Sequence, residues 1–141
     1  LAKANFELST QDKAKEVLNI SLDRTFFNDV ISESYYTIFY SAKAFLLYLG
    51  IKTEPPEEHK KTYEEFRKIV ESRKIDKQLS EIYEEESNKA ETLLRIFFDE
   101  KRNRGKFTYN VNANANKPFA EQSIKNARFF ASTIKHLIEN K

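Results

Sequence analysis

Turn-forming residues are scarce in this chain, which has only two glycines and three prolines among its 141 residues. A strand-rich fold of this length needs many turns, and glycine and proline supply most of them. The scarcity therefore favours a few long helices. At this length the chain is expected to form one domain, residues 1–141, with a hydrophobic core of its own.

Apolar residues recur at helical spacing in five segments, which predicts an all-α fold. The expected helices cover about residues 2–23, 28–49, 57–72, 76–102 and 118–139. Gly50 and Gly105 are the expected stops of the second and fourth helices, and residues 103–117 are expected to be irregular. Together these segments predict a mostly antiparallel bundle of five helices, with the second helix at its centre.

Residues 34–50 form the most apolar of these segments, with four aromatic side chains between positions 35 and 40. A helix that is apolar nearly all round is buried at the centre of a domain, or has one face against a second chain. The run therefore predicts the central helix and a homodimer formed through it or through the last helices. Lys43 interrupts the run, and such a cation needs an acidic side chain from another helix, a bound phosphate or an exit to water.

Charge and cysteine content narrow the possible functions. The chain has 24 basic and 22 acidic residues, a net charge of +2, so any nucleic-acid function must rest on a local cluster. It has no cysteine, which excludes disulfides and sulfur-ligated zinc and suits a reducing cytoplasm. No apolar run approaches the roughly 20 residues of a membrane span, so no membrane association is expected.

Acidic residues gather along the fourth expected helix. A carboxylate metal site in a helical bundle needs Glu-x-x-His pairs on facing helices, and the chain has no such pair. The cluster is therefore interpreted as a solvated acidic face, and neither a metal nor a cofactor is expected. Its members are Glu81, Glu84, Glu85, Glu86 and Glu91.

The strongest local binding signal lies at the end of the fourth expected helix. Four cations occur within six residues, with aromatics beside them, a combination that suits a phosphate and a stacked base. The alternative is a solvated helix end where the helix dipole favours cations. The cations are Lys101, Arg102, Arg104 and Lys106, and the aromatics are Phe107 and Tyr109.

Six residues are the resulting candidates for nucleotide or phosphate binding. Arg102, Arg104 and Lys106 are expected to contact phosphate, and Tyr109 to stack or to form a hydrogen bond. Lys43 and His59 are candidates for the wall of a pocket. The alternative for His59 is a half-buried histidine that forms a hydrogen bond with a tyrosine.

The apolar run resembles the second-helix pattern of HEPN domains, a family of small helical nucleotide-associated proteins. Phe27 stands where an aromatic enters that helix, and residues 34–50 resemble its small-polar-Tyr-Tyr run that ends in glycine. His59 resembles the histidine on the following helix. Residues 127–130 are similar to the Ala-x-x-Phe pattern of the last helix. The resemblance implies a four-helix up-and-down core plus an extra helix, and a minimal nucleotidyltransferase as partner in a two-component, toxin–antitoxin-like pair.

Ribonuclease members of this family carry an arginine, then four to six intervening residues, then a histidine. Here Arg102 and Arg104 stand at the position of the arginine, but no histidine follows either of them at that spacing, and Tyr109 lies there instead. A tyrosine is a poor general base near neutral pH. We therefore expect a non-catalytic protein that binds a nucleotide, RNA or a partner protein. The alternatives are a metal-independent ribonuclease with an atypical, histidine-less motif, and a dimeric protein that serves only protein interactions.

Overall fold

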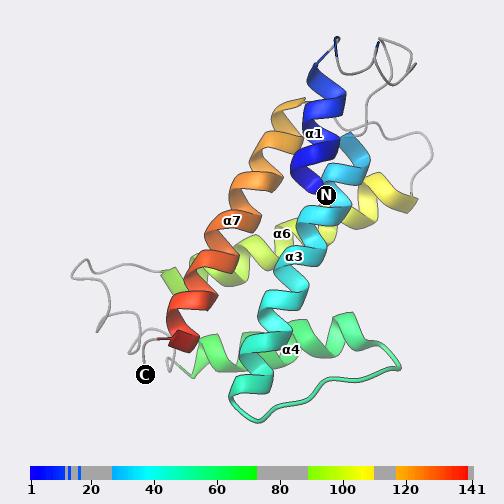
Figure 1. The fold of residues 1–141 in the computed structure, drawn as a ribbon. Helices are drawn as coiled ribbons and strands as arrows, with labels where there is room; N and C mark the ends of the chain where they lie inside the picture. The colour runs from blue at the N-terminus through cyan, green and yellow to red at the C-terminus, as the bar shows by residue number, and fades with distance from the viewer. Residues whose placement is uncertain (12, 14–15, 17–26, 73–88, 110–116, 140–141) are drawn as a thin grey trace. The chain divides into compact units, whose positions relative to one another are not determined.

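The computed structural model describes residues 1–11, 13, 16, 27–72, 89–109 and 117–139. Within these ranges the chain forms five α-helices and no β-strand, which confirms the predicted all-α fold class (Figure 1). None of the helices in these ranges combines the length and apolar character that a membrane crossing requires. The helices are α1 (Ala2–Thr10), α3 (Phe27–Tyr48), α4 (Glu58–Glu71), α6 (Lys89–Tyr109) and α7 (Lys117–Glu139).

The chain divides into two compact units. The first unit comprises Leu1–Tyr36 and Glu100–Ala127, and the second comprises Thr37–Asp99 and Arg128–Lys141. Helix α1 belongs to the first unit and α4 to the second, whereas α3, α6 and α7 each contribute one part to each unit. That residues 1–141 fold as one domain stays a prediction.

The core of the first unit lies between α1 and the beginnings of α3 and α7. The rings of Phe6 and Phe27 lie 6.1 Å apart, centroid to centroid. Next to them the Asn5 side-chain amide donates a 2.7 Å hydrogen bond to the Glu33 carboxylate, so α1 is held on α3 by apolar and polar contacts together. The cluster consists of Phe27, Val30 and Ala120, with Phe6 and Ile124 packed against it.

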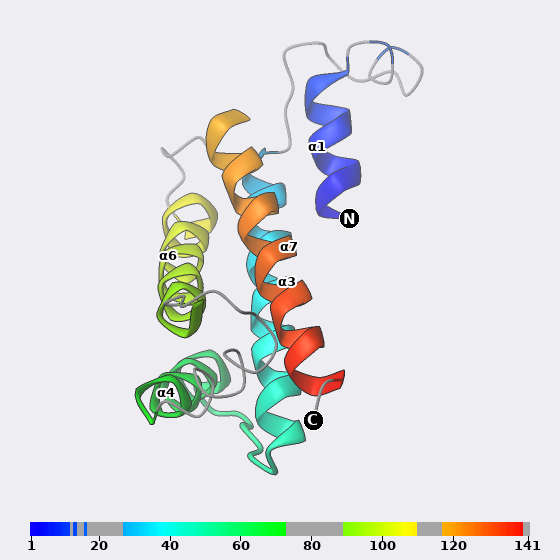
Figure 2. The same cartoon turned by 90° about the vertical axis from the view of Figure 1, so that its left-hand side faces the viewer.

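Four phenylalanines form the centre of the second unit, one each from α3, α4, α6 and α7. Phe66 of α4 lies 6.5 Å from Phe45 of α3, 5.8 Å from Phe97 of α6 and 5.5 Å from Phe130 of α7, between ring centroids. All four side chains are fully buried. Each such burial contributes about 1.5–3 kcal/mol. In Figure 2 α4 is seen nearly end-on beside the lower part of α3, so the two helices cross at a steep angle.

Helix α3 ends where the sequence predicted. Gly50 has a φ of +83°, the left-handed conformation that favours glycine. The Gly50 amide donates to the Leu47 carbonyl at 2.9 Å, and the Ile51 amide donates to the Leu46 carbonyl at 2.8 Å. These two bonds form a Schellman motif, which satisfies carbonyls that the helix end would leave without donors.

The predicted helix over residues 2–23 is wrong at Gln11, where α1 has ended. The Gln11 backbone is extended, with φ −107° and ψ 105°. Just before it, the Ser9 and Thr10 hydroxyls donate to the carbonyls of Asn5 and Phe6, a local bonding pattern that competes with helix propagation. Most of the rest of the predicted segment, residues 12, 14–15 and 17–23, lies outside the described residues.

The predicted end of the fourth helix is also wrong, because α6 continues through Gly105 to Tyr109. Gly105 does not have a positive φ, and so it does not stop the helix. An interior glycine costs about 1 kcal/mol relative to alanine, which contacts of the neighbouring residues can offset. The irregular segment expected over 103–117 is thus helical up to Tyr109, and residues 110–116 lie outside the described ranges, as do residues 76–88 of the predicted helix.

Candidate functional site

The six predicted binding residues fall into two groups. Four belong to the first unit, where they lie on the second half of α6, and two belong to the second unit, where they lie on α3 and α4. The first group is Arg102, Arg104, Lys106 and Tyr109, and the second is Lys43 and His59.

Arg104 is held against α3 by two tyrosines. Its Nη2 donates a 2.8 Å hydrogen bond to the Tyr36 hydroxyl. The guanidinium carbon lies 4.9 Å from the centroid of the Tyr36 ring and 5.3 Å from that of Tyr35. A guanidinium over an aromatic face is attracted by the negative charge on that face, and its planar shape suits such stacking. The orientation of the half-buried Arg104 side chain is therefore set by α3.

Arg102 and Lys106 lie on a different face of α6 from Arg104. They are four residues apart, so their side chains project from neighbouring turns on the same side of the helix. Both are exposed, whereas Lys101 is half-buried. Exposed arginine and lysine side chains are common contacts to nucleic-acid phosphates.

Glu100 begins the part of α6 that belongs to the first unit, and its carboxylate is occupied inside that unit. The side chain is only 1% exposed. Its two oxygens accept hydrogen bonds from the Ser123 hydroxyl at 2.7 Å and from the Asn126 amide at 2.9 Å. This buried acid connects α6 to α7. Although it precedes the basic cluster in sequence, its carboxylate is not at the surface with those cations. The sequence did not predict the pairing of Glu100 with Ser123 and Asn126, because no spacing rule connects them.

The sequence analysis also missed Phe119. Its ring is 43% exposed on the first turn of α7, and the Lys106 ammonium lies 6.0 Å from its centroid. The sequence could have indicated Phe119, because it is an aromatic residue beside Pro118 that does not belong to the apolar face of α7. Tyr109, the predicted stacking residue, is the last residue of α6, and its side chain lies outside the described part of the structure.

In the second unit Lys43 pairs with an acidic side chain from another helix, one of the three solutions considered from the sequence. Its ammonium donates a hydrogen bond to the Glu58 carboxylate at the start of α4. His59, the next residue, is half-buried and stacks on Phe39, with 4.0 Å between ring centroids and 18° between ring planes. Both predicted residues thus contribute to the contact between α3 and α4.

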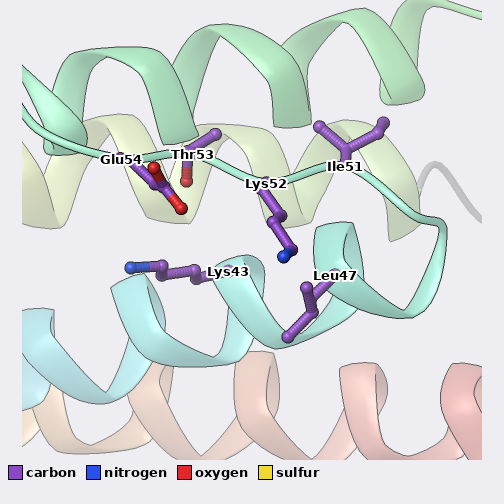
Figure 3. A pocket seen from close by; sticks show the side chains of 6 residues that line it. All are labelled: Lys43, Leu47, Ile51, Lys52, Thr53 and Glu54. Atoms are coloured by element: carbon purple, nitrogen blue, oxygen red, sulfur yellow. The ribbon is translucent and has the colours of Figure 1, made fainter.

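Lys43 also lines a small cavity beneath the segment that follows α3 (Figure 3). The cavity measures about 210 Å³, below the roughly 300 Å³ at which small-molecule sites begin. The segment above it is held to α4 by a 2.7 Å hydrogen bond between the Thr53 and Thr62 hydroxyls. Thr62 in turn donates to the Glu58 carbonyl at 2.7 Å. The residues that line the cavity are Lys43, Leu47, Ile51, Lys52, Thr53 and Glu54.

A wider hollow of about 700 Å³ borders the same segment. Besides residues 51–55 it is lined by Lys61 and Glu65 of α4, so its lining includes two basic and two acidic side chains. Such a lining has no dominant charge with which to select an anion or a cation. The cationic surface of α6 is therefore the stronger candidate for a binding site.

No group of side chains suited to a metal ion occurs among the described residues. Glu91 of the predicted acidic face is exposed, and residues 81–86 lie outside the described ranges. No protein-family model, curated protein or solved structure matches this chain. What the site can do therefore follows from its own geometry and charge.

Proposed function

We propose that this protein is a HEPN-like helical protein that binds RNA or nucleotides through their phosphates without cleaving them. The observation that carries the proposal is the cationic second half of α6. There Arg102 and Lys106 are exposed one turn apart, and Arg104 is fixed against Tyr36. Exposed cations can reach phosphates from solvent, and phosphate contacts supply most of the affinity in non-specific binding.

The distribution of histidines supports binding over cleavage. The chain has two histidines, His59 on α4 and His136 on α7. Metal-independent RNA cleavage needs a group that transfers a proton near neutral pH, and histidine is the side chain best suited to it. No histidine lies on α6 with the cations.

The test is an RNA-binding measurement in EDTA with a single-stranded oligonucleotide of mixed sequence. Arg102→Ala and Lys106→Ala are each expected to weaken binding several-fold and to reduce the salt dependence, because one phosphate contact on a single strand accounts for a slope of about 0.7 in log K against log salt. Arg128→Ala, which removes an exposed cation from the second unit, is the control and is expected to have no effect.

Two results would overturn the proposal. Cleavage of the RNA by the wild type, lost in Arg102→Ala, would establish the atypical ribonuclease. Intact RNA that does not shift on a native gel, together with no nucleotide binding by calorimetry, would overturn the proposal in favour of a protein that serves only protein interactions.

An exposed apolar face on α3 supports a homodimer as part of the proposal. Tyr40 is 61% and Leu47 54% exposed, and Ala44 and Tyr48 lie on the same side of the helix. A contiguous apolar face of this kind marks an interaction surface more often than an isolated exposed residue does. The solution mass from light scattering should be that of two chains and should fall to one chain in Tyr40→Lys/Leu47→Lys. A wild-type monomer would refute the dimer.

The likeness of residues 34–50 to the HEPN pattern supports a second partner, a minimal nucleotidyltransferase, as in a toxin–antitoxin-like pair. Co-expression of the two proteins followed by affinity purification tests this pairing. Recovery of a stoichiometric complex that survives high salt is the expected result, and separate elution of the two proteins would contradict it.

A further inference from the structure

Phe119 is an exposed ring on an anchored part of the first unit. The next residue, Ala120, is fully buried in the cluster with Phe27 and Val30. The first turn of α7 is therefore fixed by its own core contact, and the direction in which Phe119 projects is fixed with it. With the backbone fixed, only the two side-chain torsions of Phe119 are left to order when another flat group stacks on the ring.

The charge beside the ring distinguishes Phe119 from an ordinary exposed aromatic. The Lys106 ammonium lies 6.0 Å from the ring centroid, within the range of a cation–π contact. Lys106 is four residues from Arg102 on the exposed face of α6. The surface thus presents an aromatic face next to cations, the combination with which proteins hold single-stranded nucleic acid.

We propose that Phe119 is the base-stacking residue of this site and that the ligand is single-stranded nucleic acid. This inference rests on the proposed function, which places phosphates on Arg102 and Lys106. A base of the strand stacks on the ring while the neighbouring phosphates contact the two cations. A duplex keeps its bases stacked on one another, and so it cannot use the ring. The same reasoning distinguishes a strand from inorganic phosphate, which has no base.

The first test compares two ligands with the same number of phosphates, a single-stranded RNA 12-mer and an abasic 12-mer. Phe119→Leu keeps an apolar side chain but removes the ring, and Phe129→Leu removes an exposed ring from the second unit as a control. Phe119→Leu is expected to weaken binding of the RNA about tenfold and to leave abasic binding unchanged, because stacking acts only on bases. Arg102→Ala is expected to weaken both ligands, and Phe129→Leu neither.

Phe119→Leu and Arg102→Ala distinguish base stacking on Phe119 from phosphate binding on α6. Equal RNA affinity for Phe119→Leu and wild type, with Arg102→Ala still impaired, would overturn stacking on Phe119 and leave phosphate binding standing. No effect of either variant would overturn both proposals. Equal binding of duplex and single strand by the wild type would also overturn the inference.

The chain contains no tryptophan, so Phe119→Trp introduces a single fluorescent reporter at this position. Because residue 119 is exposed, the larger ring can be accommodated, and an unchanged circular dichroism melt checks that the variant folds. Stacking predicts quenching that saturates with the RNA 12-mer and is absent with the abasic 12-mer. An unquenched signal at RNA concentrations that saturate binding by anisotropy would overturn the inference.

Discussion

Arg104 donates a 2.8 Å hydrogen bond to the hydroxyl of Tyr36, a residue 68 positions earlier in the chain. The bond joins α6 to α3 within the first unit, and the guanidinium also lies over the Tyr36 ring. One arginine thus contacts the hydroxyl and the face of the same tyrosine.

Replacing Tyr36 with phenylalanine tests the hydrogen bond while keeping the ring. We expect a loss of about 1–2 kcal/mol in the free energy of unfolding, because the bond involves a charged donor in a half-buried position. Urea unfolding followed by circular dichroism measures it. Lys101→Ala, which changes a neighbouring cation of α6, is the control and should change stability by less than about 0.5 kcal/mol. Equal stability of Tyr36→Phe and the wild type would show that the Tyr36 bond contributes nothing.

The two glycines should respond oppositely to alanine. Gly105 lies inside α6, and a methyl group added there would meet no atom within 4 Å, so Gly105→Ala should stabilise the protein by about 0.5–1 kcal/mol. Gly50 has a φ of +83°, so Gly50→Ala should destabilise it by about 1 kcal/mol. Thermal or urea unfolding of both variants gives the comparison. A destabilising Gly105→Ala would mean that α6 does not continue through this position.

The buried Glu100 predicts a graded response to substitution. Glu100→Ala removes the acceptor of the Ser123 and Asn126 hydrogen bonds and should cost about 2 kcal/mol or more in unfolding free energy. Glu100→Gln keeps one acceptor oxygen and should cost less. Glu121→Ala removes an exposed acid from α7 and should stay within about 0.5 kcal/mol of wild type. An alanine variant as stable as the glutamine variant would contradict the role of the carboxylate.

Phe66 should be among the most sensitive positions of the second unit. Its fully buried ring packs against Phe45, Phe97 and Phe130, so Phe66→Ala leaves a cavity and should cost about 3–5 kcal/mol. Phe129→Ala, one residue before Phe130 but 37% exposed, should cost far less. Denaturant unfolding distinguishes the two. Similar losses in both variants would be incompatible with this core.

The helices with the clearest apolar spacing and flanking residues were the ones whose ends were predicted most accurately. Apolar spacing and flanking glycine or proline predicted α3, α4 and α7 to within about one residue at each end. The failures came from single-residue signals. Gly105 was interpreted as a stop, but a glycine only permits a helix to end and does not force it to do so. Apolar residues continue at helical spacing beyond Gln11, but the helix ends there, just after the hydroxyls of Ser9 and Thr10 bond to backbone carbonyls.

The candidate site was predictable in composition but not in its contacts. The cations of α6 stand together in the sequence, so their clustering needed no structure. The partner of Arg104 lies 68 residues away, and no spacing rule connects the two. For Lys43 an acidic side chain from another helix was one of three predicted solutions, and its identity as Glu58 required the packing of α4 on α3.

The hydrogen bond between the Thr53 and Thr62 hydroxyls, which holds the segment after α3 to α4, has a defined donor and acceptor. Thr62 has one hydroxyl proton and donates it to the Glu58 carbonyl, so in its bond with Thr53 it can only accept. Thr53 must therefore be the donor. The two threonines look symmetric in their 2.7 Å contact, yet they are not interchangeable. Loss of the hydroxyl at position 53 removes one donor to Thr62, whereas loss of the hydroxyl at position 62 removes the acceptor of the Thr53 proton and the side-chain donor to the Glu58 carbonyl.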